Sequence, residues 1–194
     1  MDARQRKTRV ALATAVLEVA SEQSIAEATV SQLAARAGVH RSTFYEFASS
    51  PIDLLQTVLR GELDVVREQF LVDVDATRVA RALTNTTSAV LEHVEQHESI
   101  YRRGLGEGSE GASLHAMLSD HFEQSTRLLL SQHSISVPAI DGLPDGAVRD
   151  AVAGYIADGT VGAIEVWLRA PAPRDRAAFL RLFAALVPAW WPTQ

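Results

Sequence analysis

The sequence contains no cysteine among its 194 residues, and this absence removes several kinds of site at once. Disulfide bonds, thiolate metal ligands and cysteine nucleophiles are all excluded, and a reducing cytoplasm is the natural compartment for such a chain. Long apolar runs are also missing, because Thr14 and Glu18 interrupt the apolar stretch that follows the basic N-terminus. The sequence therefore predicts a cytoplasmic protein with neither a signal peptide nor a membrane span.

Alternating apolar and polar residues, which indicate β-strands, are lacking as well. Apolar residues recur instead at spacings of three and four, and the chain is 47% hydrophobic and 22% charged, as is typical of a soluble globular protein. The pattern predicts an all-α fold of about nine helices. On the first of them, the expected apolar stripe consists of Val10, Ala13, Leu17 and Ala20. The expected helices span about 8–23, 30–37, 40–47, 51–72, 77–96, 99–105, 113–132, 147–169 and 174–187.

The net charge of -6 is distributed unevenly along the chain. Residues 1–60 hold seven basic and six acidic side chains, whereas residues 61–194 hold eleven basic and eighteen acidic ones. The acidic excess therefore belongs to the C-terminal part. Four of the N-terminal cations, Arg4, Arg6, Lys7 and Arg9, lie ahead of or at the start of the first expected helix, where they form a short basic arm that could lie along a polyanion.

Residues 29–47, TVSQLAARAGVHRSTFYEF, have the pattern of two short helices joined at a glycine. Thr29 stands three residues before Gln32, which is the spacing of an N-terminal capping pair. Gly38 can adopt the left-handed conformation that ends a helix, and the small side chain of Ala34 lies where the two helices would cross. The pattern predicts a helix-turn-helix, whose second helix offers polar side chains to the major groove of DNA.

This motif, with one helix before it and a long helix after it, resembles the N-terminal domain of TetR-type bacterial transcriptional regulators. The resemblance implies a helix-turn-helix DNA-binding domain at 1–50 and a ligand-binding and dimerisation domain at 51–194. It also implies a homodimer that binds a palindromic operator in double-stranded DNA and releases it when a small-molecule effector binds. The residues expected to contact DNA are Thr29, His40, Arg41, Ser42, Thr43, Tyr45 and Ser50, with Arg4, Arg6 and Lys7 of the basic arm.

Three positions depart from the pattern of that family. The family often ends the second motif helix with Tyr-x-His-Phe, whereas residues 45–48 read Tyr-Glu-Phe-Ala, which places the second aromatic residue, Phe47, one position early. His40 stands where a small capping hydroxyl is commoner. Pro51 replaces a lysine that often opens the fourth helix and touches a phosphate. The hydroxyl of Ser50 and the free N–H groups at the start of that helix are expected to hold a phosphate in place of the lysine.

Small residues are frequent in the expected helix at 147–169. A glycine in a helix costs about 1 kcal/mol relative to alanine, but it allows a second helix to approach closely. Together with the apolar helix at 174–187, this segment resembles the four-helix dimer interface of the family, and core packing within one subunit is the alternative. The expected interface residues are Gly154, Ile156, Gly159, Gly162, Trp167, Phe179, Phe183 and Leu186.

Histidines offer the main alternative to a DNA-binding function. His93 and His97 stand four residues apart on one helical face, a spacing that can hold a metal ion. No glutamate follows His93 directly, as a zinc-peptidase motif requires, and the sequence indicates no third ligand. A solvated polar face is therefore the preferred interpretation, and no metal or cofactor is expected. Because a Gly-x-Ser-x-Gly motif is also lacking, no catalytic residue and no enzymatic activity are expected.

The effector cannot be identified from the sequence. A small-molecule site requires a largely apolar pocket with a few polar or aromatic groups, for which the candidates are His93, His97, Tyr101, His121, Phe122 and Trp167. The leading hypothesis is a homodimeric, cytoplasmic, TetR-like repressor with no membrane partner. One alternative is a helical metal-binding protein or enzyme that uses His93 and His97, and another is a helical adaptor in which residues 30–47 bind a protein.

Overall fold

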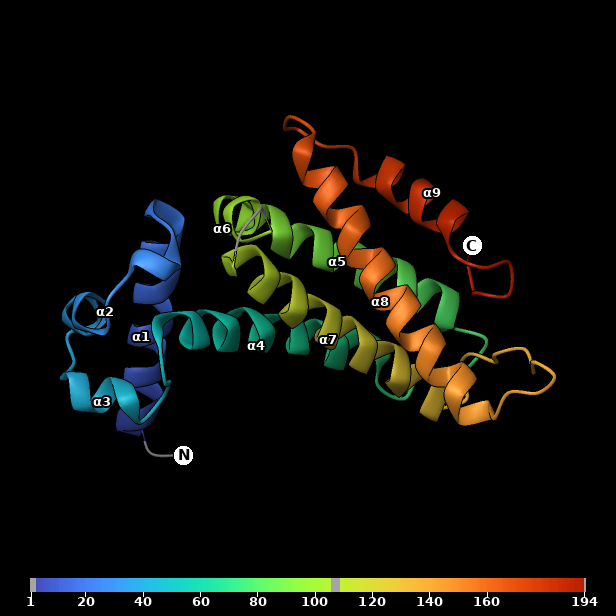
Figure 1. Ribbon diagram of the computed structural model, residues 1–194, viewed down its shortest axis with the longest axis horizontal. Coiled ribbons are helices and arrows are strands. Elements are labelled where there is room, and N and C mark those ends of the chain that lie inside the picture. Colours follow the sequence, from blue (N-terminus) through green and yellow to red (C-terminus); the bar gives the residue numbers. More distant parts are fainter. Residues whose placement is uncertain (1–2, 106–108, 194) are drawn as a thin grey trace. The chain divides into compact units, whose positions relative to one another are not determined.

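The computed structural model describes residues 3–105 and 109–193 (Figure 1). In these ranges the chain forms nine α-helices and a short 3-10 helix, Ile25–Glu27, and it contains no β-strand, which confirms the predicted all-α fold. Among the described helices, none combines the length and the apolar character that a bilayer span requires. The helices are α1 (Ala3–Glu22), α2 (Val30–Ala37), α3 (Arg41–Tyr45), α4 (Pro51–Leu71), α5 (Val79–Gln96), α6 (Glu98–Gly104), α7 (Ser109–Ser131), α8 (Asp145–Arg169) and α9 (Arg176–Leu186).

The chain divides into two compact units. The first consists of Met1–Gly61 and His97–Leu114, and the second consists of Glu62–Gln96 and His115–Gln194. The first unit therefore includes the first half of α4 and the whole of α6, in addition to the three N-terminal helices. The boundary expected at residue 50 coincides with the start of α4, whereas this division falls within α4 and adds residues 97–114 to the first unit, where α6 packs against α1.

Helix α2 begins and ends where its capping residues predict. The Thr29 hydroxyl oxygen accepts a hydrogen bond from the Gln32 N–H at 3.1 Å, which satisfies one of the free donors at the start of the helix. At the other end, Gly38 has a φ of 66°, and the Val39 N–H donates to the Ala34 carbonyl at 2.9 Å. This left-handed glycine turns the chain from α2 into α3.

The buried face of α1 differs from the expected stripe. Val10 is 60% exposed, while Leu12, Val16 and Val19 are fully buried. Apolar residues occur on several sides of α1, so that more than one stripe fits the helical period, and packing against α2 and α6 selects one of them. The core of the first unit also contains Ile25, Leu33, Ala34, Phe44, Leu55 and Leu59.

The expected basic arm is part of a helix. Because α1 begins at Ala3, residues Arg4, Arg6 and Lys7 lie in its first turns rather than in an extended segment ahead of it. Arginine, glutamine and lysine are good helix formers, and neither glycine nor proline interrupts them, so the helix extends further than the apolar pattern indicated. The prediction of an arm is therefore wrong, although all three side chains are exposed as expected.

Helix α6 is tied to the end of α1 through an arginine. The Arg103 guanidinium donates to the Ala20 and Ser21 carbonyl oxygens at 3.1 and 2.8 Å. The last carbonyls of a helix have no partner within the helix, and a cation suits their negative end of the dipole. Arg103 thus satisfies two backbone acceptors while it fixes α6 against α1.

The second unit has a core to which α5, α7, α8 and the C-terminal segment contribute. Helix α9 is joined to α5 by the Arg176 guanidinium, whose Nε donates to the Glu95 carboxylate at 2.7 Å. One end of the core is a cluster made of Leu71, Val79, Ala82, Leu129, Leu130, Ile135, Ile156 and Trp191.

Candidate DNA interface and effector cavity

Helix α3 presents a polar face over a buried aromatic anchor. Phe44 is fully buried, whereas Arg41 and Ser42 are exposed and Tyr45 is 54% exposed. His40 precedes the helix and is also exposed, and its side chain makes no capping hydrogen bond, as expected for a residue that replaces a capping hydroxyl. The helix therefore offers guanidinium, hydroxyl, phenol and imidazole groups to a partner, with the half-buried Thr43 beside them.

The start of α4 is closed by its own side chains. The Ser50 hydroxyl oxygen accepts the Asp53 N–H at 3.2 Å, and the Asp53 carboxylate accepts both the N–H and the O–H of Ser49 at 2.7 Å. The hydrogen bond from the Ser49 backbone N–H, followed by that from its hydroxyl, lowers the pKa of Asp53 below its usual range. The carboxylate thus binds Ser49 and places a negative charge at the start of α4, although the Ser50 hydroxyl hydrogen can still be donated to a phosphate.

The first turn of α1 carries an unfavourable charge. The positive end of the helix dipole lies there, yet the first turn contains no acidic residue, while Arg4, Arg6 and Lys7 are basic and exposed. The positive end of the dipole repels these cations, and a polyanion that binds them would relieve the repulsion. Thr29 is exposed too, but its oxygen is engaged as the cap of α2.

A small cavity of about 70 Å³ lies within the second unit. Seventeen side chains from α4, α5, α7, α8, α9 and the C-terminal segment line it, and none of them is an aspartate, glutamate, lysine or arginine. Most of the wall is apolar, and the polar groups are hydroxyls and one imidazole, which belong to Thr86, Thr87, Ser125, Thr126, Thr160 and His121.

Two of the six side chains expected around an effector, His121 and Phe122, line this cavity. His93, His97, Tyr101 and Trp167 are not among its wall residues. Trp167 is buried against Phe179, with ring centroids 5.9 Å apart, and Tyr101 is fully buried in the first unit. The threonine and serine hydroxyls of the wall were not foreseen, because a hydroxyl on an amphipathic helix gives no sign of which cavity it reaches.

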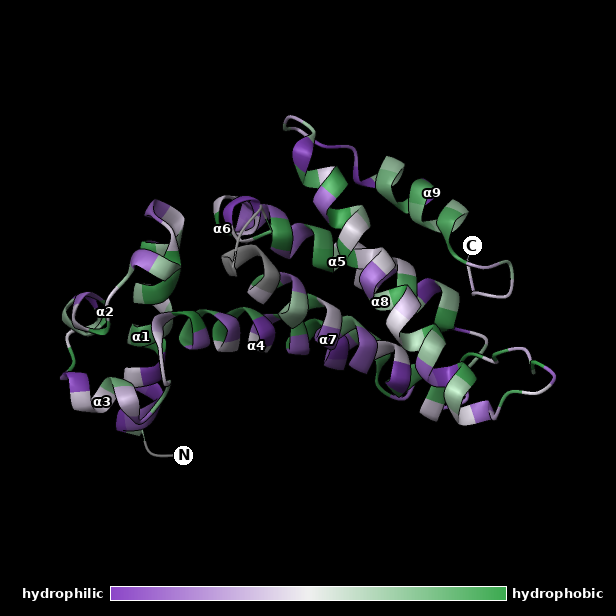
Figure 2. Ribbon diagram, in the orientation of Figure 1, coloured by the Kyte–Doolittle hydropathy of each residue, from purple (hydrophilic) through white to green (hydrophobic). Residues whose placement is uncertain are grey.

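An exposed apolar surface runs along α8 and α9. Tyr155 and Val166 are 64% and 57% exposed, and Leu182 and Leu186 are 44% and 56% exposed. This α8/α9 face includes a groove of about 420 Å³, and in Figure 2 most of α9 has the colour of hydrophobic residues. A Cβ added at Gly154, Gly159 or Gly162 of α8 would have no described atom within 4 Å, apart from its chain neighbours and the nearby backbone of the helix itself.

The eight residues expected at the dimer interface fall into two groups. Gly154, Gly159, Gly162, Phe183 and Leu186 are at least partly exposed. Ile156, Trp167 and Phe179 are between 2% and 8% exposed and pack within the subunit. A helix with apolar residues all round it, such as α8, gives no indication in the sequence of which side faces the core.

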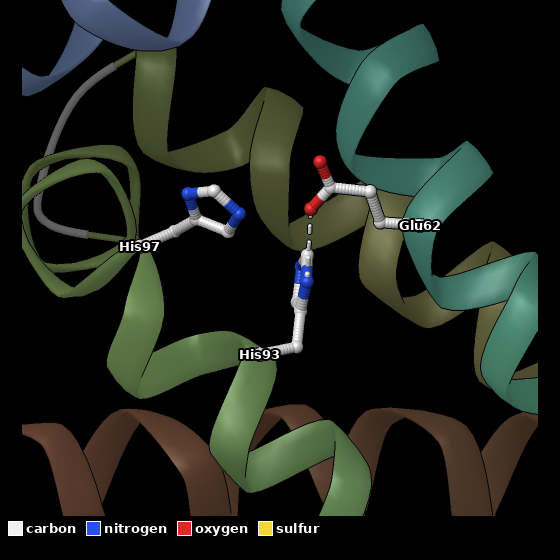
Figure 3. A group of neighbouring side chains, drawn as sticks. All are labelled: Glu62, His93 and His97. Carbon is white, nitrogen blue, oxygen red and sulfur yellow. Dashed lines mark ion pairs between the residues drawn. The ribbon is translucent and has the colours of Figure 1, made fainter.

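The histidine pair does not form the solvated face that the sequence analysis preferred, because His93 is only 6% exposed. Its Nδ1 lies 3.3 Å from Oε2 of Glu62 on α4. His97 directly follows α5, and one ligand atom from each of the three side chains lies within 4.8 Å of the others (Figure 3). Glu62 was not among the expected residues, because it is far from both histidines in the chain and only the fold brings it to them.

Comparison with solved structures places the fold among transcriptional regulators. The dihydroxyacetone kinase operon activator DhaS has a TM-score of 0.62 and 13% identity, and the match covers 92% of this chain and 94% of that one. A TetR transcriptional regulator from Rhodococcus sp. RHA1 has a TM-score of 0.59 and 16% identity, with 96% and 98% covered. SmeT, the repressor of the Stenotrophomonas maltophilia efflux pump SmeDEF, has a TM-score of 0.57 and 16% identity, with 97% and 96% covered.

No family model and no curated protein matches the sequence. The structural matches nevertheless extend over almost the whole of each chain, so the likeness includes both the helix-turn-helix and the larger helical part. The protein therefore has the fold of the TetR-type transcriptional regulators. An activator and a repressor are both among the similar structures, so the fold itself does not determine the direction of regulation.

Proposed function

We propose that this protein is a DNA-binding transcriptional regulator that acts as a homodimer in the cytoplasm. The observation that carries the proposal is the surface of α3, where Arg41, Ser42 and Tyr45 are exposed above the buried Phe44. Such a helix can enter the major groove, and its guanidinium, hydroxyl and phenol groups can bind base edges and phosphates. The shared fold with known transcriptional regulators supports this reading of the surface.

The distribution of charge supports DNA binding through the unit that contains α3. The protein carries a net charge of -6, so its surface as a whole repels a polyanion. The exposed Arg4, Arg6 and Lys7 at the start of α1 lie in the same unit as α3 and provide a local positive region. They would contact phosphates without regard to base sequence, and that part of the affinity would fall as the salt concentration rises.

A second copy of the chain is the proposed occupant of the α8/α9 face. Exposed Tyr155, Val166, Leu182 and Leu186 form an apolar surface, and the bare α8 glycines let another helix approach its backbone. A two-fold dimer would place two α3 helices about 34 to 36 Å apart, one turn of DNA. The corresponding operator is a palindrome.

The cavity of the second unit is the proposed effector site. Its wall lacks a charged side chain, which favours an uncharged, largely apolar molecule. At about 70 Å³ the cavity is much smaller than a site for a drug-sized ligand, so a larger effector would have to push the helices around it apart. Such a displacement is the proposed way in which an effector releases a repressor from its operator.

The proposal is tested by selecting bound sequences from a random duplex library and then titrating the selected duplex with salt. We expect a palindrome to be enriched and Arg41→Ala to weaken its binding by roughly 5- to 150-fold, the range for one lost base contact. Arg81→Ala is the matched control, because Arg81 is an exposed arginine on α5, in the other unit and away from the α8/α9 face, and its removal changes the net charge equally.

Two results would overturn the proposal. One is the failure of the folded protein to enrich any sequence at low salt, and the other is an equal loss of affinity in the two arginine variants. A reporter gene placed behind the selected operator then gives the direction of regulation, since a repressor lowers and an activator raises its expression.

A further inference from the structure

The side chains of Glu62, His93 and His97 form a compact group at the end of α5 (Figure 3). His93 lies in the last turn of α5, His97 directly follows that helix, and Glu62 reaches them from α4. We propose that these three side chains bind a divalent transition-metal ion of the zinc type. None of the three lines the cavity proposed for the effector, and none belongs to the helix-turn-helix.

The distances suit a small metal ion. Zinc binds histidine nitrogen at about 2.0–2.1 Å and carboxylate oxygen at about 2.0–2.2 Å, so two ligand atoms of a tetrahedral ion are about 3.4 Å apart. The 3.3 Å between Nδ1 of His93 and Oε2 of Glu62 already has this length. One ligand atom of His97 lies within 4.8 Å of a ligand atom of each of the other two side chains, so a tetrahedral site requires an approach of about 1.4 Å or less.

The types of ligand indicate which metals fit. Two imidazoles and one carboxylate suit zinc and its transition-metal neighbours, whereas magnesium and calcium prefer sites made of oxygen atoms. His93 is almost completely buried, while 42% of the Glu62 side chain is exposed. Solvent can therefore reach the carboxylate side of the group, where water would complete a four-coordinate ion.

A simpler explanation covers part of the same geometry. An ion pair between His93 and Glu62 accounts for their 3.3 Å separation, but it does not require His97. The metal site does require His97, whose spacing of four residues from His93 places both imidazoles on one side of the chain. The two explanations therefore differ in the role that they give to His97.

The experiment measures zinc binding by calorimetry with the untagged, full-length protein after treatment with a chelator. We expect one zinc ion per subunit, with affinity reduced by about 100-fold or more in His97→Ala and in Glu62→Gln, because each variant removes one of three ligands. Both residues are partly exposed, so these variants are expected to keep the fold, which thermal unfolding without metal would verify. His133→Asn is the control, since it removes an exposed histidine whose φ of 58° asparagine tolerates.

Cobalt provides a second measurement, because its visible spectrum reports a tetrahedral site directly. We expect that spectrum in the wild type and in His133→Asn, and we expect it to be absent in His97→Ala. The inference is overturned if the wild type binds no zinc, or if His97→Ala and Glu62→Gln bind it as tightly as the wild type does. Neither measurement uses DNA, so the result does not depend on whether the protein is a transcriptional regulator.

Discussion

Phe44 and Tyr45 are neighbouring aromatic residues with opposite surroundings. Both belong to α3, where Phe44 is fully buried in the core of the first unit and Tyr45 is 54% exposed. Their rings meet edge to face, with centroids 5.7 Å apart and an interplanar angle of 88°. One side chain therefore holds α3 in place, and the next one is available to a partner.

We expect truncation of these two residues to separate stability from DNA binding. Phe44→Ala leaves a cavity in the core and should lower the free energy of unfolding by about 3–5 kcal/mol. Tyr45→Ala should change it by no more than about 0.5 kcal/mol, as is usual at the surface, yet weaken operator binding about fivefold or more. Urea unfolding and a DNA-binding titration of both variants measure the two effects. Wild-type affinity in Tyr45→Ala would show that the exposed ring does not contact DNA.

Individual residues of the candidate DNA surface were predictable, because the helix-turn-helix pattern fixes which positions face outward. The third member of the histidine group was not predictable. In the sequence Glu62 is a polar position of α4 like any other surface residue, and its proximity to His93 depends on the packing of α4 against α5. A sequence pattern records neighbours along one helix and carries little information about neighbours on another.

Hydrogen bonds among Ser49, Ser50 and Asp53 stabilise the first turn of α4. Pro51 at the first helical position has no N–H to satisfy, and the hydrogen bonds from Ser49 to Asp53 stabilise the ionised carboxylate. The pKa of Asp53 is thereby lowered relative to its ordinary value of 3.8. This stabilisation is present above the ordinary pKa and is lost as the pH falls through the lowered one.

We expect Asp53→Asn to be less sensitive to acid than the wild type. At about pH 6 the variant should be less stable, because the ionised carboxylate is absent. The difference should shrink as the pH falls below the ordinary pKa of 3.8, where the carboxylate of the unfolded chain is protonated, and should vanish below the lowered pKa of the folded protein. Urea unfolding at the two pH values measures it, with Asp141→Asn, an exposed loop residue, as the control for the lost charge. A difference in stability that stays constant with pH would contradict this account of the cap.

The boundaries of the helices could be predicted where the chain marks them. Thr29 and Gly38 give α2 the same two ends in the sequence and in the structure, since each supplies a specific hydrogen bond or backbone angle. Helix α1 has no comparable start signal, and its beginning was therefore placed five residues too late. Its buried side was also predicted incorrectly, because apolar residues such as Val10 and Leu12 lie on different sides of it.

At the scale of the whole molecule, the α8/α9 face is an apolar surface that a single subunit leaves exposed. Leu186 lies in its groove together with Tyr155 and Gly159. We expect Leu186→Glu to shift the protein from dimer to monomer in analytical ultracentrifugation, because a buried unpaired carboxylate would oppose association. Leu143→Glu, at a leucine that is 53% exposed in a loop, is the matched control and should remain dimeric. A dimeric Leu186→Glu protein would place the subunit contact elsewhere.

The overall architecture was more accessible from the sequence than the effector. The helices of the described residues, including the helix-turn-helix and the long helix after it, can be predicted from local patterns of apolar and capping residues. The wall of the cavity is made of side chains from five helices and the C-terminal segment, so its shape depends on how these elements pack against one another. No local pattern specifies it, and the same architecture occurs in regulators as different as DhaS and SmeT.

Gly154, Gly159 and Gly162, the partly exposed glycines of the α8/α9 face, have a consequence for how the protein would respond to its own abundance. If a second copy covers them, association is governed by mass action, and dilution removes both the partner and the stability that it provides. At low abundance the dimer population then varies with the square of the subunit concentration. A regulator built in this way would leave its operator more abruptly during growth and division than a monomeric one, since halving the subunit number would reduce the active species about fourfold.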